Sequence, residues 1–389
     1  MSGRLVFTGG GWITEPEQRS RRARIIDAHT HVFPPLLSQE EGIPPELRRR
    51  IWQFHSREFN NWWRVSDGRH VDRRFLEFDA DDIDQMPDVD FRLTDFGKAR
   101  ITVDGEDYEM QFYTPNLVNN ELPPERVVGE MNMAGVDVGV LQADHVYGEL
   151  SAYFAAAGRA YPGRFIGLAQ IWEPEANDEG RLARLDQAFT DHGCGGLYFS
   201  VEPFSVMQQD CSLNAPRLEA LWALVRRHRV PIFWFLDDRS HDRIAMFMRR
   251  VAELDEWARR NPDIDTVITH GLVPAAIIHD IGIPDAVIDL LRHANVFGEL
   301  LFPAKFADYP YPEGQAMLRA LRDQVGAEKL VWGSDSPWSL TVWCTSRQSL
   351  DFIRVHCDFL DADEIDQILG VNVAGILGID PYHDDSDRS

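Results

Sequence analysis

The sequence predicts an α/β protein that folds as a (β/α)8 TIM barrel with an insertion after its first strand. Eight short apolar segments alternate with amphipathic segments along the 389 residues. The apolar segments have no polar face, which is typical of parallel strands buried on both sides. A doubly wound open sheet is the alternative, but it usually has a Gly-rich phosphate loop after an early strand, and the sequence contains none.

The first predicted strand begins at Ile25 and stops before the Pro34-Pro35 pair. Because alternate residues of a strand point to the same face, His29 and His31 are expected to project together from its C-terminal end. Two converging imidazoles are a natural start for a metal site, since neutral imidazole suits Zn, Fe, Co and Ni. The alternative is that one histidine is exposed and the other is a hydrogen-bonded core residue.

The chain divides into three parts. Residues 1–24 are expected to form an N-terminal extension with a short β-like segment, residues 25–379 the barrel, and residues 380–389 an acidic C-terminal tail. Within the barrel, residues 60–121 are rich in aromatic and charged side chains, and Asp104-Gly105 joins two alternating segments as in a β-hairpin. We expect residues 60–121 to form a lid-like insertion over the barrel mouth. Its aromatic residues either line a substrate pocket or form the insertion's own small core.

Helical and strand patterns alternate over the rest of the chain. Apolar residues at spacings of three and four predict a helix within 38–60. After residue 121, apolar runs predict the strands 138–142, 165–171, 196–200, 230–235, 266–270, 296–300 and 330–335. Amphipathic segments predict the helices 123–133, 150–160, 180–191, 215–228, 241–260, 284–293, 314–325 and 362–377.

Composition excludes several classes of protein. The formal net charge of −24 argues against nucleic acid and anionic membranes as partners, because both need a basic surface. The four cysteines have no C-x-x-C spacing, which favours reduced thiols over a disulfide framework. There is no signal-peptide core, and no apolar run approaches the roughly 18 residues of a membrane helix. We therefore expect a cytoplasmic protein.

Polar residues at the predicted strand ends point to a single site, since barrel enzymes build their sites there. His29 and His31 follow the first strand, and the other strand ends contribute Asp144, His145, His270, Glu299 and Asp335. Together they predict a mononuclear metal site with an acid/base beside it. Each residue also has a structural alternative. Asp335 and His270 could form caps or turns, His145 could be a loop residue, and Glu299 could pair with a loop Lys or Arg.

Four motifs resemble the amidohydrolase-2 family, in the branch of aminocarboxymuconate semialdehyde decarboxylase and the γ-resorcylate, dihydroxybenzoate and carboxyvanillate decarboxylases. They are Asp27-Ala28-His29-Thr30-His31, Thr269-His270-Gly271, Gly333-Ser334-Asp335-Ser336-Pro337 and the closing Ile368-Leu369-Gly370-Val371-Asn372-Val373-Ala374-Gly375-Ile376-Leu377-Gly378. In the last motif Val373 separates an Asn and an Ala that are usually adjacent in the family. The resemblance covers residues 25–37 and about 122–379.

The resemblance implies one divalent metal ion, with zinc expected and manganese, iron or cobalt as alternatives. His29, His31 and Asp335 match metal-ligand positions, and His270 matches the acid/base histidine. One departure is clear, because Phe235 stands where the family has a metal-binding His at the end of the fifth strand. Either a fourth ligand comes from His270, Asp237 or Asp238, or the metal is bound weakly with water or substrate completing its shell, or the metal has been lost.

The resemblance further implies a metal-dependent, non-oxidative decarboxylase of a small aromatic or unsaturated carboxylic acid. The predicted catalytic residues are His270, which would protonate the carbon that bears the carboxylate, and Asp335. Trp234, Phe235 and Trp338 are expected to wall a pocket for a planar ring, with Glu299 and His145 as further substrate contacts. Arg64 or Arg73 of the insertion could clamp a second anionic group.

Two other functions use the same residues. One is a metal-dependent hydrolase that activates water against a lactone, amide or ester. The other is a metal-free or non-catalytic barrel that binds a small molecule. The expected partner is a small aromatic or unsaturated carboxylate, and the family resemblance also implies a homodimer.

Overall fold

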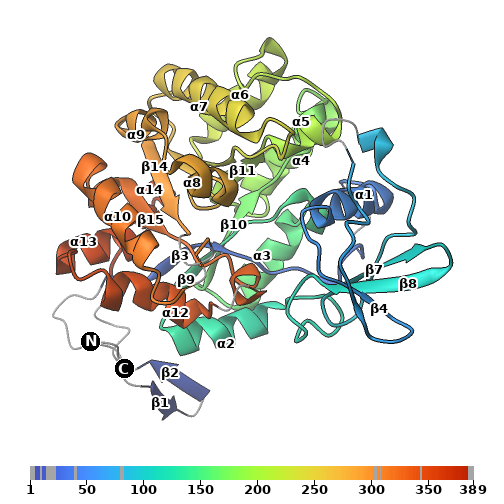
Figure 1. Ribbon diagram of the computed structural model, residues 1–389. Coiled ribbons are helices and arrows are strands. Elements are labelled where there is room, and N and C mark those ends of the chain that lie inside the picture. Colours follow the sequence, from blue (N-terminus) through green and yellow to red (C-terminus); the bar gives the residue numbers. More distant parts are fainter. Residues whose placement is uncertain are drawn as a thin grey trace.

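The computed structural model of the protein describes residues 5–8, 11–14, 23–38, 42–78, 83–301, 305–306, 308–341 and 344–383. In the predicted N-terminal extension, β1 (Leu5–Thr8) and β2 (Gly11–Thr14) pair as an antiparallel hairpin, and β2 lies against the helix over Pro124–Ala134, labelled α2 in Figure 1. The rest of that extension up to residue 22, and the acidic residues 384–389 of the predicted tail, lie outside the described residues.

An eight-stranded parallel sheet forms a nearly closed barrel, which confirms the predicted fold class. Its strands are short, and nearly all their residues are buried, because helices cover one face and the barrel interior the other. In chain order they are β3 (Ile26–Thr30), β9 (Val138–Leu141), β10 (Phe165–Ala169), β11 (Gly196–Ser200), β12 (Ile232–Phe235), β13 (Thr266–Ile268), β14 (Val296–Leu300) and β15 (Leu330–Trp332).

The barrel closes between β3 and the residues that follow β15. The backbone N–H of Asp335 donates to the His29 carbonyl at 2.8 Å, and that of His31 donates to the Ser336 carbonyl at 3.1 Å. Gly333 permits this approach, because a Cβ atom there would lie only 2.7 Å from the Cβ of His29. The first and last strand ends are thereby held side by side.

Helices surround the sheet, as Figure 1 shows. All the predicted helices are present within a few residues of their expected ends: α1 (Pro45–Ser56), α2 (Pro124–Ala134), α3 (Ser151–Ala160), α4 (Glu179–Thr190), α6 (Glu219–His228), α7 (Arg243–Arg260), α9 (Asp285–Leu291), α10 (Pro312–Val325) and the closing helical run from α13 (Ala362–Asp366) through a π-helical turn to α14 (Asn372–Leu377). Four shorter helices were not expected from the sequence: α5 (Glu202–Val206), α8 (Ala275–Ile281), α11 (Trp338–Thr341) and α12 (Ser346–Asp351). None of the described helices is long and apolar enough to cross a membrane.

The segment between α1 and α2 contains a separate five-stranded antiparallel sheet. The predicted hairpin is present, with a turn at Asp104-Gly105 joining its two longest strands, and Figure 1 shows it extending away from the barrel. The strands are β4 (Trp62–Arg64), β5 (His70–Val71), β6 (Arg92–Thr94), β7 (Lys98–Val103) and β8 (Glu106–Gln111). The aromatic residues of this segment serve both predicted purposes. Trp62 and Phe75 belong to a buried core, whereas Phe112 and Tyr113 line a cavity of the barrel.

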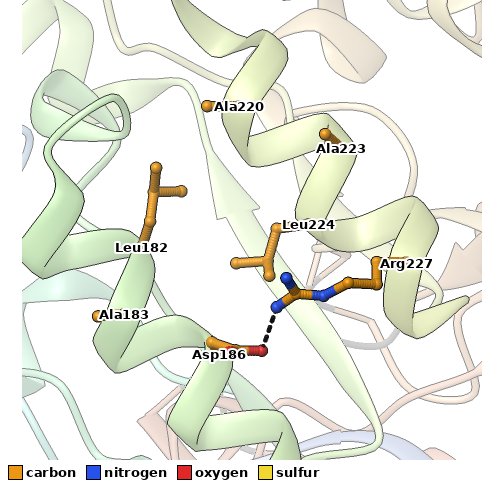
Figure 2. A pocket seen from close by; sticks show the side chains of 7 residues that line it. All are labelled: Leu182, Ala183, Asp186, Ala220, Ala223, Leu224 and Arg227. Carbon is orange, nitrogen blue, oxygen red and sulfur yellow. Dashed lines mark hydrogen bonds and ion pairs between the residues drawn. The ribbon is translucent and has the colours of Figure 1, made fainter.

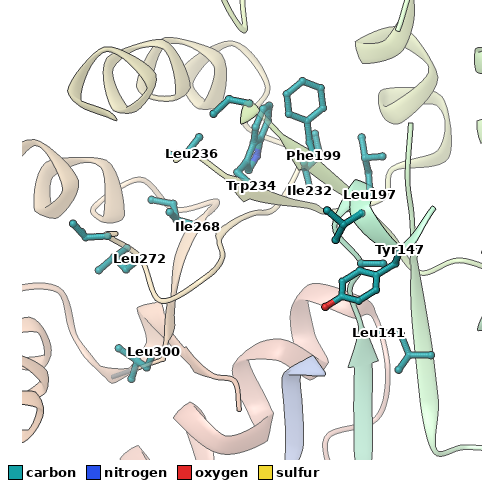
Figure 3. Close-up of a cluster of buried hydrophobic side chains, with 14 of the residues drawn as sticks. Leu141, Tyr147, Leu197, Phe199, Ile232, Trp234, Leu236, Ile268, Leu272 and Leu300 are labelled. Atoms are coloured by element: carbon teal, nitrogen blue, oxygen red, sulfur yellow. The ribbon is translucent and has the colours of Figure 1, made fainter. Parts of the chain in front are cut away.

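Strand β12 places its two last aromatic residues on opposite faces. Trp234 is fully buried among Phe199, Trp222 of α6 and Trp257 of α7, at ring distances of 5.0–5.4 Å, and Figure 3 shows Trp234 beside Phe199. Phe235 points to the barrel interior and lines the cavity there. The structure therefore does not support the prediction that Trp234 walls a substrate pocket, since its ring packs in the core between sheet and helices.

Replacing Trp234 with Ala is expected to destabilise the fold by about 3–5 kcal/mol, because a large ring leaves a cavity in a packed aromatic cluster. The free energy of unfolding, measured in urea, checks this. Trp63→Ala is the matched control, since the Trp63 side chain is 44% exposed and the change should cost no more than about 0.5 kcal/mol. Equal losses in the two variants would contradict the assignment of Trp234 to the core.

Candidate active site

Three side chains meet where the barrel closes. His29 and His31 come from β3, and Asp335 follows β15. Asp335 Oδ1 lies 3.1 Å from the Nε2 of His31 and 3.6 Å from the Nε2 of His29. All three residues are buried, and their ligand atoms lie within 4.8 Å of one another. The structure thus brings together the three residues predicted to hold a metal.

Each imidazole is oriented by a hydrogen bond between its Nδ1 atom and a fixed acceptor. His29 donates from Nδ1 to Oε1 of Glu299 at 2.9 Å, and His31 donates from Nδ1 to the Gln142 carbonyl at 2.8 Å. Because a carboxylate and a carbonyl only accept, both Nε2 atoms are directed to the common centre. Glu299 is fully buried and also accepts from Thr269 at 2.6 Å. The structure therefore does not support the expected contact of Glu299 with substrate, since its carboxylate accepts from His29 and Thr269.

The charges around His29 favour a cation. Burial opposes protonation, but Glu299 and Asp335 outweigh it and raise the pKa of His29 to about 9. The Nε2 of His29 is buried and makes no hydrogen bond within the described structure. A divalent ion binds to an unpartnered imidazole nitrogen beside a carboxylate. Binding of the ion to His29 would displace the proton from the Nε2 of this histidine. The residues present fit the predicted metal.

The fourth ligand is not supplied by the neighbouring aspartates. Asp237 is held by Arg243, and Asp238 accepts from the backbone N–H of Ser240 at 3.1 Å. Among the described residues, only the His29–His31–Asp335 group has metal-ligand spacing. Phe235, at the position of the family's strand-5 histidine, packs against the His270 ring at 4.2 Å. The geometry therefore favours three protein ligands.

His270 lies beside this group, just past the end of β13. Its ring is 4.5 Å from that of His29, and its Nε2 is 3.8 Å from Oδ2 of Asp144. Its Nδ1 is buried without a hydrogen-bond partner in the described structure. Burial, reinforced by the nearby His29, His31 and Lys305, pushes the pKa of His270 well below its usual range. An imidazole with free nitrogens in this position can carry a proton to or from a bound molecule.

A cavity of about 320 Å³ opens from the three-residue group. Its lining combines aromatic rings with titratable groups. The described lining residues are His31, Trp52, His55, Glu58, Phe59, Phe112, Tyr113, Asp144, Val146, Tyr147, Phe235, Asp237, Arg239, His270, Pro274, Ala275, Leu301, Lys305, Asp335 and Trp338. A second cavity, between α4 and α6 on the outer surface, contains none of the predicted site residues, as Figure 2 shows.

Two of the predicted substrate contacts line the cavity that opens from His31 and Asp335, and the others do not. Phe235 and Trp338 are part of its wall. His145 turns away into a buried pair with Glu173, 2.6 Å from Nε2 to Oε2, so the structure does not support its contact with substrate. Arg64 pairs with Asp67 at 3.1 Å and Arg73 lies over the Phe75 ring, and neither is among the described residues of the wall.

Several lining residues were missed by sequence reasoning. Trp52 and His55 come from α1, whereas Phe112 and Tyr113, which follow the insertion's last strand, belong to the aromatic residues expected either to line a pocket or to form the insertion's own core. The helical pattern of α1 indicated only that one face is buried, because periodicity does not say against what. Asp144, by contrast, is among the strand-end residues that the sequence predicts for the site, and it lines the cavity.

Comparison with known proteins assigns the chain to a family. The family model described as amidohydrolase matches residues 26–379, nearly the whole chain. The chain belongs to the amidohydrolase family. This agrees with the motifs at His29, His31, His270 and Asp335, and both decarboxylases and hydrolases occur among the structural relatives of this amidohydrolase. A search of curated proteins found no match.

Solved structures confirm the fold of this amidohydrolase. A protein described as a probable 2-pyrone-4,6-dicarboxylic acid hydrolase of Acinetobacter baumannii, with citric acid bound, has a TM-score of 0.52 and 17% identity over 67% of this chain and 90% of its own. A protein from Pseudomonas putida described by the same activity has a TM-score of 0.52 and 20% identity over 68% and 90%. The 2,6-dihydroxybenzoate decarboxylase of Rhizobium has a TM-score of 0.51 and 12% identity over 67% and 90%.

The role of Glu299 in this amidohydrolase can be tested by Glu299→Gln. We expect the affinity for zinc to fall roughly 10- to 100-fold, because an acceptor that orients a ligand imidazole is weakened. Competition with a chromogenic chelator measures this affinity. Glu173→Gln is the matched control, since Glu173 is an equally buried partner of a histidine outside the cavity. An unchanged affinity in the Glu299 variant would refute the positioning role.

Proposed function

We propose that this amidohydrolase is a metal-dependent, non-oxidative decarboxylase of a small aromatic or unsaturated carboxylic acid. The observation that supports this best is the position of His270. Its imidazole lies between the three-ligand group and Phe235, at the edge of a cavity walled by aromatic rings. Decarboxylation needs one proton delivered to carbon, which His270 could supply, and a surface on which a planar ring can pack, which Phe235 and Trp338 could offer.

The residues would act in a simple order. His29, His31 and Asp335 would hold a divalent ion, with zinc proposed, which would supply Lewis acidity toward the substrate. His270 then gives a proton to the carbon that bears the carboxylate, and the C–C bond electrons return to the ring as CO2 leaves. Asp144, 3.8 Å from the Nε2 of His270 and hydrogen-bonded to Tyr198, faces the imidazolium that must be formed before this step.

The aromatic walls would hold the ring and exclude water. Phe235, Trp338 and Phe112 line the cavity, and the rings of Phe112 and Trp338 are 5.5 Å apart. Loss of a charged carboxylate into a neutral product is favoured when the surrounding groups are apolar. We also propose that residues 60–121 serve as the lid of this cavity, and that the protein works as a cytoplasmic homodimer.

Hydrolysis of a lactone, amide or ester is the second candidate. Asp335 supports it, because this carboxylate lines the cavity and could take a proton from an attacking water molecule. A third candidate is a barrel that binds a small molecule without catalysis.

One experiment separates these functions. The zinc-loaded protein is incubated in D2O with hydroxybenzoic acids and, separately, with pyrone lactones. Release of CO2 with deuterium on the vacated carbon supports decarboxylation. Ring opening of the lactone without CO2 would favour hydrolysis instead. Absence of any bound metal after loading with zinc, manganese, iron or cobalt would contradict both enzymatic proposals.

A further inference from the structure

The cations of the cavity differ in whether they have an acidic partner. Arg239 lies 2.8 Å from Glu58 and 3.0 Å from Glu202, so its charge is balanced within the protein. Lys305 lines the same cavity, and in the described part of the chain no carboxylate lies within ion-pair distance of its Nζ. Its ammonium donates to the carbonyl of Val273 at 2.8 Å. That hydrogen bond uses one of the three N–H donors of the ammonium. A carbonyl oxygen carries no full negative charge, so it does not neutralise the lysine.

The backbone makes room for this lysine next to the acid/base histidine. Gly271 follows His270 in the chain and has φ +74°. A Cβ on Gly271 would lie 2.4 Å from Cε of Lys305 and 3.2 Å from its Nζ. The Lys305 side chain thus lies directly across the bare backbone of Gly271. This packing fixes the ammonium beside His270 and on the wall of the cavity.

Lys305 is half-buried, and a partly desolvated ammonium without a carboxylate partner is unfavourable unless an anion pairs with it. Burial lowers the pKa of Lys305 to about 8, although Asp237, Asp335 and Glu299 act in the opposite direction. These carboxylates are engaged elsewhere, by Arg243, His31 and His29 respectively. Arg243 further lowers the pKa of Lys305, and His270 also faces it. Near neutral pH the ammonium is mostly charged and available to an anion that enters the cavity.

We propose that Lys305 is a specificity-determining residue that binds a second anionic group of the substrate, a carboxylate, apart from the group held at His29, His31 and Asp335. This inference rests on the proposed function, which identifies the cavity as the substrate-binding site. A lysine offers a compact charge with rotatable donors, which suits a single carboxylate oxygen. The preferred ligand is therefore a planar dicarboxylate rather than a monocarboxylate.

The test compares two probes on the zinc-loaded protein, benzene-1,3-dicarboxylate and benzoate, by isothermal titration calorimetry. The wild-type protein should bind the dicarboxylate more tightly. Lys305→Met should weaken dicarboxylate binding roughly tenfold or more, since a charge-assisted hydrogen bond is lost, and leave benzoate binding nearly unchanged. Lys305→Gln is a second variant in case the first folds poorly. Lys98→Met, a change in a surface lysine paired with Glu109, is the matched control.

The pH dependence adds an independent readout. Between about pH 7 and about pH 9.5 the wild-type preference for the dicarboxylate should fall, because Lys305 loses its proton near pH 8. Lys305→Arg should keep its preference over this range, since a guanidinium stays charged up to about pH 12.

The outcomes distinguish the two proposals. If the wild-type protein prefers the dicarboxylate and Lys305→Met does not, the inference holds even where no acid is decarboxylated, and only the proposed reaction fails. If wild type and Lys305→Met bind the dicarboxylate equally, or if wild type does not prefer it, the role of Lys305 is overturned.

Discussion

Replacing His270 with Asn is expected to lower kcat by roughly 10²- to 10⁴-fold, the usual contribution of a positioned general acid. Asn suits the backbone here, because His270 has φ 55° and Asn tolerates the left-handed region better than most residues. The amide cannot deliver a proton to carbon. The fold and the bound metal should be unaffected, since His270 is outside the three-residue ligand group.

Single-turnover rates of CO2 release, together with metal content and thermal unfolding, measure this effect. His293→Gln is the matched control, because His293 pairs with Asp255 at 2.7 Å and is not part of the described cavity wall. Wild-type turnover in the His270 variant would remove this residue from the mechanism. A proportional loss of metal would instead show that His270 is a ligand.

Asp335→Asn is expected to remove the metal and with it roughly 10³-fold or more of the activity, because a Lewis acid supplies several kcal/mol of transition-state stabilisation. The substitution keeps the side-chain shape, and Asn accepts the φ of 54° found at Asp335. It removes the only carboxylate of the three-residue group and leaves the two imidazoles as its remaining ligand groups.

Metal content by inductively coupled plasma mass spectrometry, after dialysis and reloading with zinc, checks this loss. Asp144→Asn serves as the control for metal content, since Asp144 lines the same cavity but is not in the ligand group. Retention of a full metal complement by the Asp335 variant would contradict the proposed coordination.

The barrel and its ligand group could be predicted because both depend on local patterns. Strand alternation places His29 and His31 on one face, and parallel strands in a barrel bring their ends to one rim. That is why Asp335, about three hundred residues away, could be assigned to the same centre.

The predictions for Trp234 and Glu299 are not supported by the structure, because the local sequence pattern does not tell which side of a strand, or which neighbour, a residue faces. In Ile232-Phe233-Trp234-Phe235 every residue is apolar, so the sequence does not say whether Trp234 or Phe235 faces the barrel interior. Glu299 was placed correctly at a strand end, but its role depends on the neighbour it meets across the barrel.

The remaining cavity residues could not be predicted, because they come from segments whose paths are set by tertiary packing. Trp52 and His55 reach the cavity only because α1 lies over the barrel mouth. Lys305 was not predicted, since nothing near it in the sequence indicates a close approach to Gly271.

The hydrogen bonds that join β3 to the Ser334–Ser336 segment have a consequence for how the protein is made. A ribosome synthesises His29 and His31 about three hundred residues before Asp335, so a growing chain first has two of the three residues and no carboxylate. Metal uptake should therefore await synthesis of the last barrel strand and of the Asp335 that follows it. A bound ion would then stabilise only molecules whose barrel is closed, since a ligand that binds the native state alone stabilises that state.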